Sequence, residues 1–238
     1  MPLRRYNPFE DINPRVNLEV NPYIKEVVEA SKNETLPIVY GPYLKGIAGN
    51  WGNFLETRGG MNAAPKRLVL EIGCHLGLVL RKMAADFPED GFLGMDITFK
   101  RVMKTVKSAQ ADGTKNLGTV YCNASNIDEI FGEGELDGVI IFFPDPWAKK
   151  EKQQKNRLIN EDFAKKLFKV VKSGGFVWFK TDHKPYYNDA NSHFLDAGFT
   201  ASNESTWLSK NPYESTFETK FKLEGIPKNE NIYVKLDS

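Results

Sequence analysis

Short apolar runs alternate with longer amphipathic stretches between residues 67 and 199, and this pattern constrains the fold more than any other feature of the sequence. The apolar runs cover residues 68–72, 92–96, 117–122, 139–143 and 176–179. Apolar residues are nearly continuous in them, which is typical of strands buried on both faces of a parallel sheet. Strand and helix repeated in this order predict an α/β fold with a doubly wound, mostly parallel sheet.

Helices are expected between these strands, because apolar residues recur at helical spacing over 99–109 and 163–171. The two glycines within 173–175 favour a left-handed cap, so we expect them to end the second helix. Two further strands, near 200–207 and 232–236, are expected to form an antiparallel edge. The predicted sheet therefore has seven strands.

The 238 residues suit one large domain, or one domain with an appendage. Residues 1–60 are rich in Asn, Pro, Gly and Tyr, and predict an irregular N-terminal extension with one helix near 24–31. Residues 61–238 contain the apolar runs and are expected to form the domain proper.

Charge and cysteine content exclude several classes of protein. Lys and Arg number 32 against 31 Asp and Glu, so the chain is no globally basic nucleic-acid coat, and any site for a polyanion is a local patch. Cys74 and Cys122 lie within or beside apolar runs, which favours a reducing compartment over a disulfide scaffold. No apolar run approaches a membrane span, and the N-terminus lacks a signal-like apolar stretch. We expect a cytoplasmic protein without membrane contact.

A glycine-containing loop follows the first predicted strand, with the sequence Gly73-Cys74-His75-Leu76-Gly77. Glycines at this point let backbone amides approach a ligand. Asp96 ends the second strand, where a carboxylate accepts hydrogen bonds from both ribose hydroxyls. The pair predicts an adenosine site, against the alternative of a tight turn and a helix cap. The spacing is not that of a dinucleotide fold, which disfavours an NAD-dependent oxidoreductase.

The fourth apolar run ends in Phe-Phe-Pro-Asp-Pro-Trp, residues 142–147. Two prolines around Asp145 restrict the backbone and predict a rigid turn. A fixed carboxylate beside the flat ring of Trp147 suits a nucleobase, which offers N–H donors and a face for stacking. The alternative is a cis-proline turn with a tryptophan in the core.

A basic run follows this turn, with five basic residues and one acid over residues 149–157. Because the run adjoins the predicted site, it favours contact with a phosphate backbone over a merely solvated face. Asp182, after the fifth strand, adds another carboxylate at the same edge of the sheet. The RNA-contacting residues are expected to be Lys150, Lys152, Lys155 and Arg157.

These blocks together resemble the bacterial tRNA (guanine-N7-)-methyltransferase family, a class I S-adenosylmethionine-dependent group. The likeness runs from about residue 68 to the C-terminus. It rests on the Glu71-Ile72-Gly73-Cys74 loop, the Pro-Asp-Pro-Trp block, the Lys-Thr-Asp at 180–182 and the segment 215–221. The resemblance implies a Rossmann-like methyltransferase domain over 61–238, S-adenosyl-L-methionine as cofactor, and tRNA as partner. It further implies methylation at N7 of guanosine 46 in the variable loop.

The resemblance also implies roles for individual residues. Asp145 is the expected catalytic acid. The expected cofactor-binding residues are Glu71, Gly73, Cys74, His75, Gly77, Asp96, Ile97, Asn123, Ala124 and Asp145. The expected substrate-binding residues are Lys149, Asp182, Ser215, Thr216, Phe217 and Glu218. The chain departs from the family pattern at four places: His75 replaces a glycine, Asn123 an Asp and Ser215 a Thr, and the basic run is thinned at 153–157.

The chemistry expected of such a site is simple. N7 of guanine has an in-plane lone pair, so the reaction needs no general base, and alignment with the methyl–sulfur axis dominates. Asp145 would stabilise the positive charge that develops on the purine, while Asp182 and Glu218 would bind the N1–H and N2–H donors. The three histidines lack ligand spacing, so we expect no metal.

Two alternatives stay open from the sequence. One is a methyltransferase-like RNA-binding protein with weak or no catalysis. The other is a methyltransferase that acts on a different acceptor. No obligate protein partner is evident, and the chain is compatible with a monomer or a homodimer.

Overall fold

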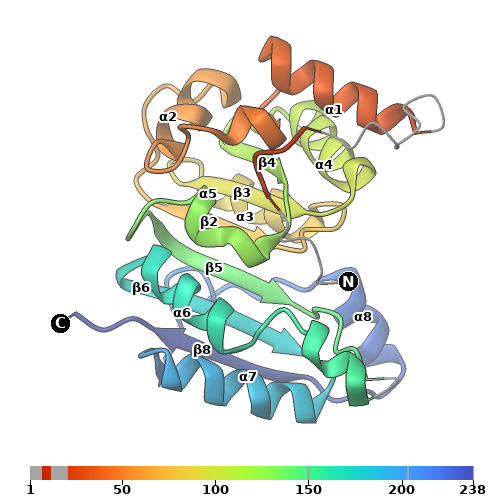
Figure 1. Ribbon diagram of the computed structural model, residues 1–238, viewed down its shortest axis with the longest axis vertical. Coiled ribbons are helices and arrows are strands. Elements are labelled where there is room, and N and C mark those ends of the chain that lie inside the picture. Colours follow the sequence, from red (N-terminus) through yellow and green to blue (C-terminus); the bar gives the residue numbers. More distant parts are fainter. Residues whose placement is uncertain (1–6, 12–20, 149–150, 203, 238) are drawn as a thin grey trace.

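A mixed sheet of eight strands, in the order β1-β4-β3-β2-β5-β6-β8-β7, forms the centre of the computed structural model (Figure 1). The structure describes residues 7–11, 21–148, 151–202 and 204–237. The strands are β1 (Ile38–Tyr40), β2 (Leu68–Ile72), β3 (Gly91–Asp96), β4 (Leu117–Tyr121), β5 (Leu136–Phe142), β6 (Val171–Thr181), β7 (Thr200–Ser202) and β8 (Asn229–Val234). The helices are α1 (Pro22–Asn33), α2 (Trp51–Phe54), α3 (Leu78–Asp86), α4 (Phe99–Ala111), α5 (Ile127–Ile130), α6 (Glu161–Val170), α7 (Lys184–Asp196) and α8 (Thr216–Leu223), with short helical turns η1 (Gly41–Leu44), η2 (Leu55–Gly59), η3 (Ala124–Asn126) and η4 (Glu151–Asn156).

The structure confirms a mostly parallel sheet with an antiparallel edge. The sheet has eight strands, one more than predicted. β1 to β6 pair in parallel, whereas β8 pairs antiparallel with both β6 and β7. The eighth strand, β1, comes from the stretch expected to be irregular, and it places Ile38 opposite Thr119 of β4. Its three residues are all buried, but a run this short between Pro37 and Gly41 carries no recognisable strand pattern.

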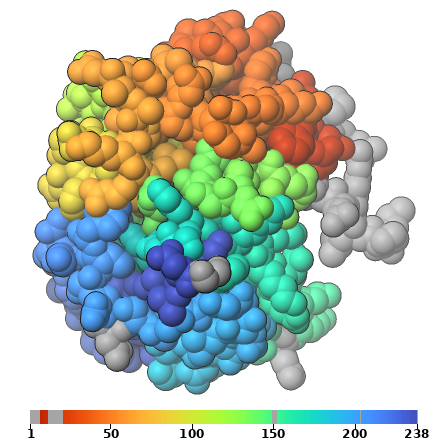
Figure 2. Space-filling model, turned by 90° about the vertical axis from the view of Figure 1, so that its left-hand side faces the viewer, coloured from red at the N-terminus to blue at the C-terminus, as the bar shows by residue number. Residues whose placement is uncertain are grey.

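The N-terminal stretch packs on the sheet through more than its predicted helix. α1 begins after Asn21, whose side chain accepts a hydrogen bond from the backbone N–H of Tyr23. Trp51 of α2 is fully buried, and its Nε1 donates to the carbonyl of Ile130 at 2.9 Å. Figure 2 shows the orange N-terminal segments in direct contact with the yellow and green ones. The division of the chain at residue 60 stays a prediction.

The expected cap at residues 173–175 is wrong. α6 ends at Val170 and the chain continues directly into β6, so these residues belong to a strand. The amide of Gly174 donates to the carbonyl of Lys235, and the amide of Lys235 donates to the carbonyl of Gly175. The glycines therefore pair with the chain that follows β8 instead of ending a helix. β7 is also shorter than predicted, and β8 begins three residues earlier.

Helices cover both faces of the sheet. One core includes residues of α2, α5, α6 and α7, while α3 packs in a second core and α1 with α4 in a third. The order of strands changes direction at β2, which has β3 on one side and β5 on the other. Ligands of such sheets bind at this point, beyond the carboxyl ends of the strands. Within the described ranges, no helix is long and apolar enough to cross a membrane.

Candidate active site

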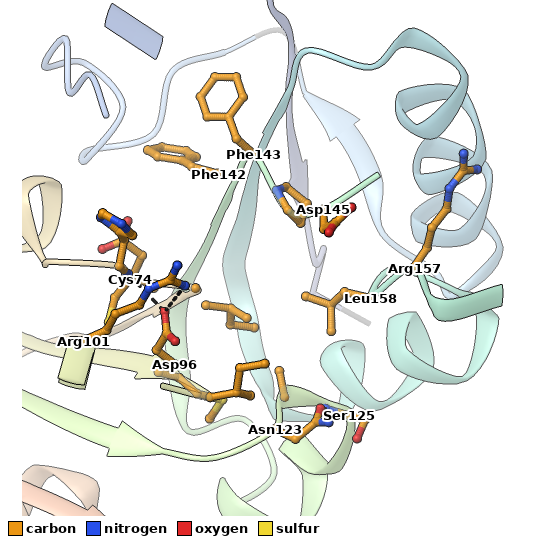
Figure 3. A pocket seen from close by; sticks show the side chains of 18 of the residues that line it. Cys74, Asp96, Arg101, Asn123, Ser125, Phe142, Phe143, Asp145, Arg157 and Leu158 are labelled. Carbon is orange, nitrogen blue, oxygen red and sulfur yellow. Dashed lines mark hydrogen bonds and ion pairs between the residues drawn. The ribbon is translucent and has the colours of Figure 1, made fainter. Parts of the chain in front are cut away.

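A cavity of about 1030 Å³ opens at the carboxyl ends of β2, β3, β4 and β5 (Figure 3). The predicted site residues that line it are Glu71, Gly73, Cys74, His75, Asp96, Ile97, Asn123, Ala124, Asp145, Lys155, Arg157, Ser215, Thr216 and Phe217. Four others, although described, are not part of its lining: Gly77, Lys152, Asp182 and Glu218. Lys149 and Lys150 lie outside the described residues. The loops after four strands thus meet around one space.

Glu71 is a buried carboxyl group with an unsatisfied oxygen. It lies on β2, is 5% exposed, and its Oε2 has no hydrogen-bond partner in the described structure. Burial raises the pKa of Glu71 to about 8, and the nearby charge of Asp96 adds to this shift. Because buried polar atoms are nearly always hydrogen-bonded, this oxygen indicates that a donor belongs in the cavity.

Asp96, by contrast, is well supplied with partners. Its Oδ1 accepts from the amide of Thr98 at 2.9 Å, and its Oδ2 accepts from the amide of His75 at 3.3 Å. Arg101, on the first turn of α4, adds an ion pair at 3.4 Å (Figure 3). Arg101 was not predicted as a site residue, although a basic residue about one helical turn after a strand-end acid is a usable signal. The ion pair and the two amides together hold the carboxyl group of Asp96 in place at the edge of the cavity.

The glycine-containing loop differs from the expected amide cradle. The amides of Gly73 and Cys74 donate to the carbonyl of Met95. The amide of Gly77 donates to the carbonyl of Cys74. Gly77 has a φ of 65°, and a Cβ there would lie 2.3 Å from Thr105. Gly77 therefore allows close packing of the loop against Thr105 of α4. A Cβ on Gly73 would meet nothing within 4 Å.

His75 is held in a strained conformation at the edge of this loop. Its φ is 51°, a region that residues with a Cβ rarely adopt. Its ring lies edge-on to Phe217 at 5.7 Å, so the loop after β2 touches the segment at the start of α8. Burial lowers the pKa of His75, and the charge of Arg101 lowers it further. A neutral imidazole follows at neutral pH.

Asn123 begins the turn after β4. Its Oδ1 accepts a hydrogen bond from the amide of Ser125 at 3.0 Å, which fixes the side chain at the start of η3. Figure 3 shows Asn123 and Ser125 across the cavity from Phe142. Leu158, which was not predicted as a site residue, also lines the cavity. An isolated leucine gives no signal of such a position.

The turn at 142–147 presents Asp145 to the cavity. Phe143 and Trp147 have positive φ values of 51° and 47°, and the prolines lie between them. The Oδ1 of Asp145 accepts from the amide of Trp147 at 2.8 Å, which closes the turn. Figure 3 places Asp145 across the cavity from Asp96 and Arg101. Trp147 is 37% exposed, so it is not a core tryptophan.

The described basic residues after this turn fall into two kinds. Lys152 and Lys155 are exposed on η4. Arg157 is buried: its Nε donates to the carbonyl of Pro146 at 2.9 Å and its Nη1 pairs with Asp189. Its Nη2 is buried and has no partner among the described residues. Lys152 and Lys155 are thus accessible to a phosphate backbone, whereas Arg157 holds the turn.

The segment at the start of α8 completes the cavity. The Oγ of Ser215 accepts from the amide of Glu218 at 3.1 Å and caps the helix. Ser215, Thr216 and Phe217 face the cavity, whereas Glu218 is turned into the protein with 2% exposure. The site therefore combines one unsatisfied acid, one ion-paired acid and one exposed acid on a rigid turn. Such a set can hold a polar cofactor and stabilise positive charge on a second ligand.

Comparisons with known proteins agree on a family. The model of a family described as putative methyltransferases matches residues 65–234. The tRNA (guanine-N7-)-methyltransferase of Bdellovibrio bacteriovorus is 30% identical over 167 residues, which cover 68% of this chain and 79% of that protein. The enzyme of the same name from Clostridium novyi is 27% identical over 227 residues, or 93% and 95% of the two chains.

Two other matches are more limited. The bifunctional glycosyltransferase/methyltransferase of Fusobacterium nucleatum is 32% identical over 123 residues, so the match covers 52% of this chain but only 19% of that protein. Among solved structures, the 16S rRNA methyltransferase KamB has a TM-score of 0.55 at 12% identity, covering 76% of this chain and 91% of that one. At this identity the likeness concerns the fold alone.

Proposed function

The chain belongs to the tRNA (guanine-N7-)-methyltransferase family, and we propose that it transfers a methyl group from S-adenosyl-L-methionine to N7 of a guanosine in tRNA. The proposed acceptor is guanosine 46 of the variable loop. One observation carries the proposal: a rigid turn holds the carboxylate of Asp145 across the cavity from Asp96 and Arg101. A second ligand can therefore meet the cofactor in front of a fixed negative charge.

The cavity suits the cofactor. The unsatisfied Oε2 of Glu71 needs a donor, and S-adenosylmethionine offers ribose hydroxyls and an ammonium group. The volume of about 1030 Å³ lies near the upper end for small-molecule sites, which leaves room for a nucleobase as well. Glu71, Asp96 and Asn123 would hold the cofactor from three strand ends. When bound, it supplies an electrophilic methyl group on a sulfonium.

Asp145 would act on the acceptor through its charge. N7 attacks with its own lone pair, so the site requires no base to generate a nucleophile. The purine becomes positively charged as the methyl group arrives, and a preorganised carboxylate stabilises that charge. The hydrogen bond from the amide of Trp147 fixes the carboxylate before the reaction. Prealigned groups of this kind need no reorganisation during the reaction.

The basic residues next to the cavity support RNA, rather than a free nucleoside, as the substrate. Lys155 lines the cavity and Lys152 lies on the same short turn, and both side chains are exposed. Lysines in this position are able to contact phosphates on either side of the reacting nucleotide. They would set the position of the tRNA without reading its sequence.

Transfer from labelled S-adenosylmethionine to an unmodified tRNA transcript tests the proposal, with the product nucleoside identified by chromatography. We expect 7-methylguanosine, and a loss of at least about a hundredfold in rate for Asp145→Asn, which keeps the shape but removes the charge. Label in a different nucleoside would contradict the proposed acceptor. Binding of tRNA without any transfer would instead favour a non-catalytic RNA-binding protein.

A further inference from the structure

Four charged side chains form a cluster beneath the segment at the start of α8: Lys180, Glu218, Lys228 and Glu230. Lys180 lies on β6 and is 2% exposed, and its Nζ donates to Oε2 of Glu218 at 3.0 Å. Its Nζ also lies 3.7 Å from Oε1 of Glu230. Lys228 pairs with Oε1 of Glu218 at 2.8 Å and with Oε2 of Glu230 at 2.7 Å. We call these residues the lysine–glutamate cluster.

Both carboxylate oxygens of Glu218 are occupied in this cluster. To bind the N–H donors of a guanine, Glu218 would have to leave two ammonium groups. Lys180 would then lie in a buried site with only the more distant carboxylate of Glu230 beside it, and breaking one partner from a buried ion pair is strongly unfavourable. The side chain of Glu218 is 3% exposed and does not line the cavity. The contacts favour a role for Glu218 inside the protein.

The cluster holds the cavity-lining segment from both ends. The Nζ of Lys180 donates to the carbonyl of Tyr213 at 3.0 Å as well as to Glu218. Residues 214–217 lie between these two attachment points, and three of them line the cavity. The amide of Glu218 also donates to the cap residue Ser215. Removing the Lys180 side chain would take one attachment from each end of the segment.

Lys180 also touches the strand that leads to the Asp145 turn. Its Nζ lies 4.4 Å from the centre of the Phe142 ring, at the end of β5. Its carbonyl accepts from the amide of Phe143 at 2.8 Å, immediately before the prolines. A single residue therefore contacts both the turn that carries Asp145 and the segment that faces it.

We propose that Lys180 is a positioning residue for methyl transfer: through Glu218 and Tyr213 it fixes the cavity-lining segment at 215–217 relative to the Asp145 turn, with Glu218 as its anchor and not as a ligand of the base. This inference rests on the proposed function. The inference concerns the acceptor side of the site. Glu71 and Asp96, which we propose bind the cofactor, lie on other strands.

The test compares Lys228→Met, Glu218→Gln and the paired change Lys180→Met with Glu218→Leu. The paired change replaces a buried ion pair by apolar groups, which proteins commonly tolerate, so it is the variant expected to fold. Lys172→Met is the matched control: it is the same substitution on the same strand, and its partner Asp137 lies outside the cavity lining. Each variant is assayed for methyl transfer at varied tRNA, with KM and kcat separated, and for binding of S-adenosylhomocysteine.

We expect the paired variant to lose at least tenfold in kcat/KM for tRNA while its affinity for S-adenosylhomocysteine stays within twofold of wild type. Lys228→Met should show a smaller loss in the same direction, and Lys172→Met none. Wild-type kinetics in Glu218→Gln, which weakens the pairing of Glu218 with Lys180 and Lys228, would overturn the inference. Wild-type kinetics in the paired variant would overturn it too. A wild-type protein that methylates no tRNA overturns the proposed function itself, and the inference with it.

Discussion

The Nε of Arg157 donates a 2.9 Å hydrogen bond to the carbonyl of Pro146, the residue next to Asp145. The same guanidinium pairs with Asp189 of α7 and lies 4.9 Å from the centre of the Tyr186 ring. Arg157, a residue of the basic run, is therefore buried in the protein and connects the turn that carries Asp145 to α7. The run therefore supports the turn through Arg157, in addition to the RNA contacts that we propose for its exposed lysines.

Arg157→Lys should accordingly impair catalysis more than tRNA binding. Lysine keeps the charge but cannot bond Pro146 and Asp189 together, because it lacks the planar fork of arginine. We expect at least a tenfold lower rate of methyl transfer under single-turnover conditions, and a loss of about 1–3 kcal/mol in the free energy of unfolding. A variant with the wild-type rate would show that the turn does not depend on Arg157.

Lys152→Ala and Lys155→Ala should behave in the opposite way. Both side chains are exposed, so their removal leaves the fold intact and deletes phosphate contacts. The slope of log K for tRNA against log salt should decrease by about 0.7–0.9 for each lysine. Filter binding at several salt concentrations measures this slope, with Lys172→Met as a control away from the cavity. An unchanged slope in both variants would remove them from the RNA interface.

The strands and their terminal residues were predictable because burial on both faces leaves a continuous apolar run. Each of Glu71, Asp96, Asn123 and Asp145 lies in, or a few residues beyond, the last residues of such a run, and the carboxyl ends of parallel strands meet at one edge. β1 was not predicted because a strand of three residues is too short to show a hydrophobic pattern. The sequence is therefore sufficient for the central parallel strands and for the residues at their carboxyl ends, but not for the edge strand β1.

The directions of side chains outside the strands were not predictable. Whether Glu218 faces a ligand or the interior depends on Lys180 and Lys228, which come from elements elsewhere in the chain. The burial of Arg157 likewise depends on Asp189, 32 residues later. Charge and helical spacing carry no information about such distant partners. These residues appear in the sequence only as charged groups near the right motifs.

The raised pKa of Glu71 makes stability depend on pH. The folded chain keeps a proton on Glu71 between about pH 4.5 and about pH 8, whereas the unfolded chain releases it. The unfolded state thus binds fewer protons in this window, so the free energy of unfolding falls as pH rises through it. The contribution of this group is at most about 1.4 kcal/mol per pH unit.

Glu71→Gln isolates this contribution. The amide has no proton to lose, so the stability of the variant relative to wild type should rise between pH 5 and pH 8. Denaturant unfolding at both pH values measures the difference. In the wild type, affinity for S-adenosylhomocysteine should rise with pH over the same window, because the ionised carboxylate is the better acceptor. A parallel pH dependence of stability in wild type and variant would contradict the assignment.

Two substitutions at His75 should have different effects. At a φ of 51°, a β-branched side chain is strained more than histidine, so His75→Val should lower the free energy of unfolding by about 1–3 kcal/mol. His75→Gly relieves the strain but adds freedom to the unfolded chain, and its stability should stay within about 1 kcal/mol of wild type. The glycine variant should bind S-adenosylhomocysteine at least as tightly as wild type. Thermal denaturation with and without the ligand measures both effects.

The most direct test of the central claim is to map the methylated position in tRNA. After incubation with the protein and S-adenosylmethionine, an unmodified transcript is treated with borohydride and aniline, which cleave the strand at 7-methylguanosine. We predict a single break at guanosine 46 that is lost with Asp145→Asn. An intact strand after wild-type treatment, or a break that the Asp145→Asn protein produces equally well, would contradict the account.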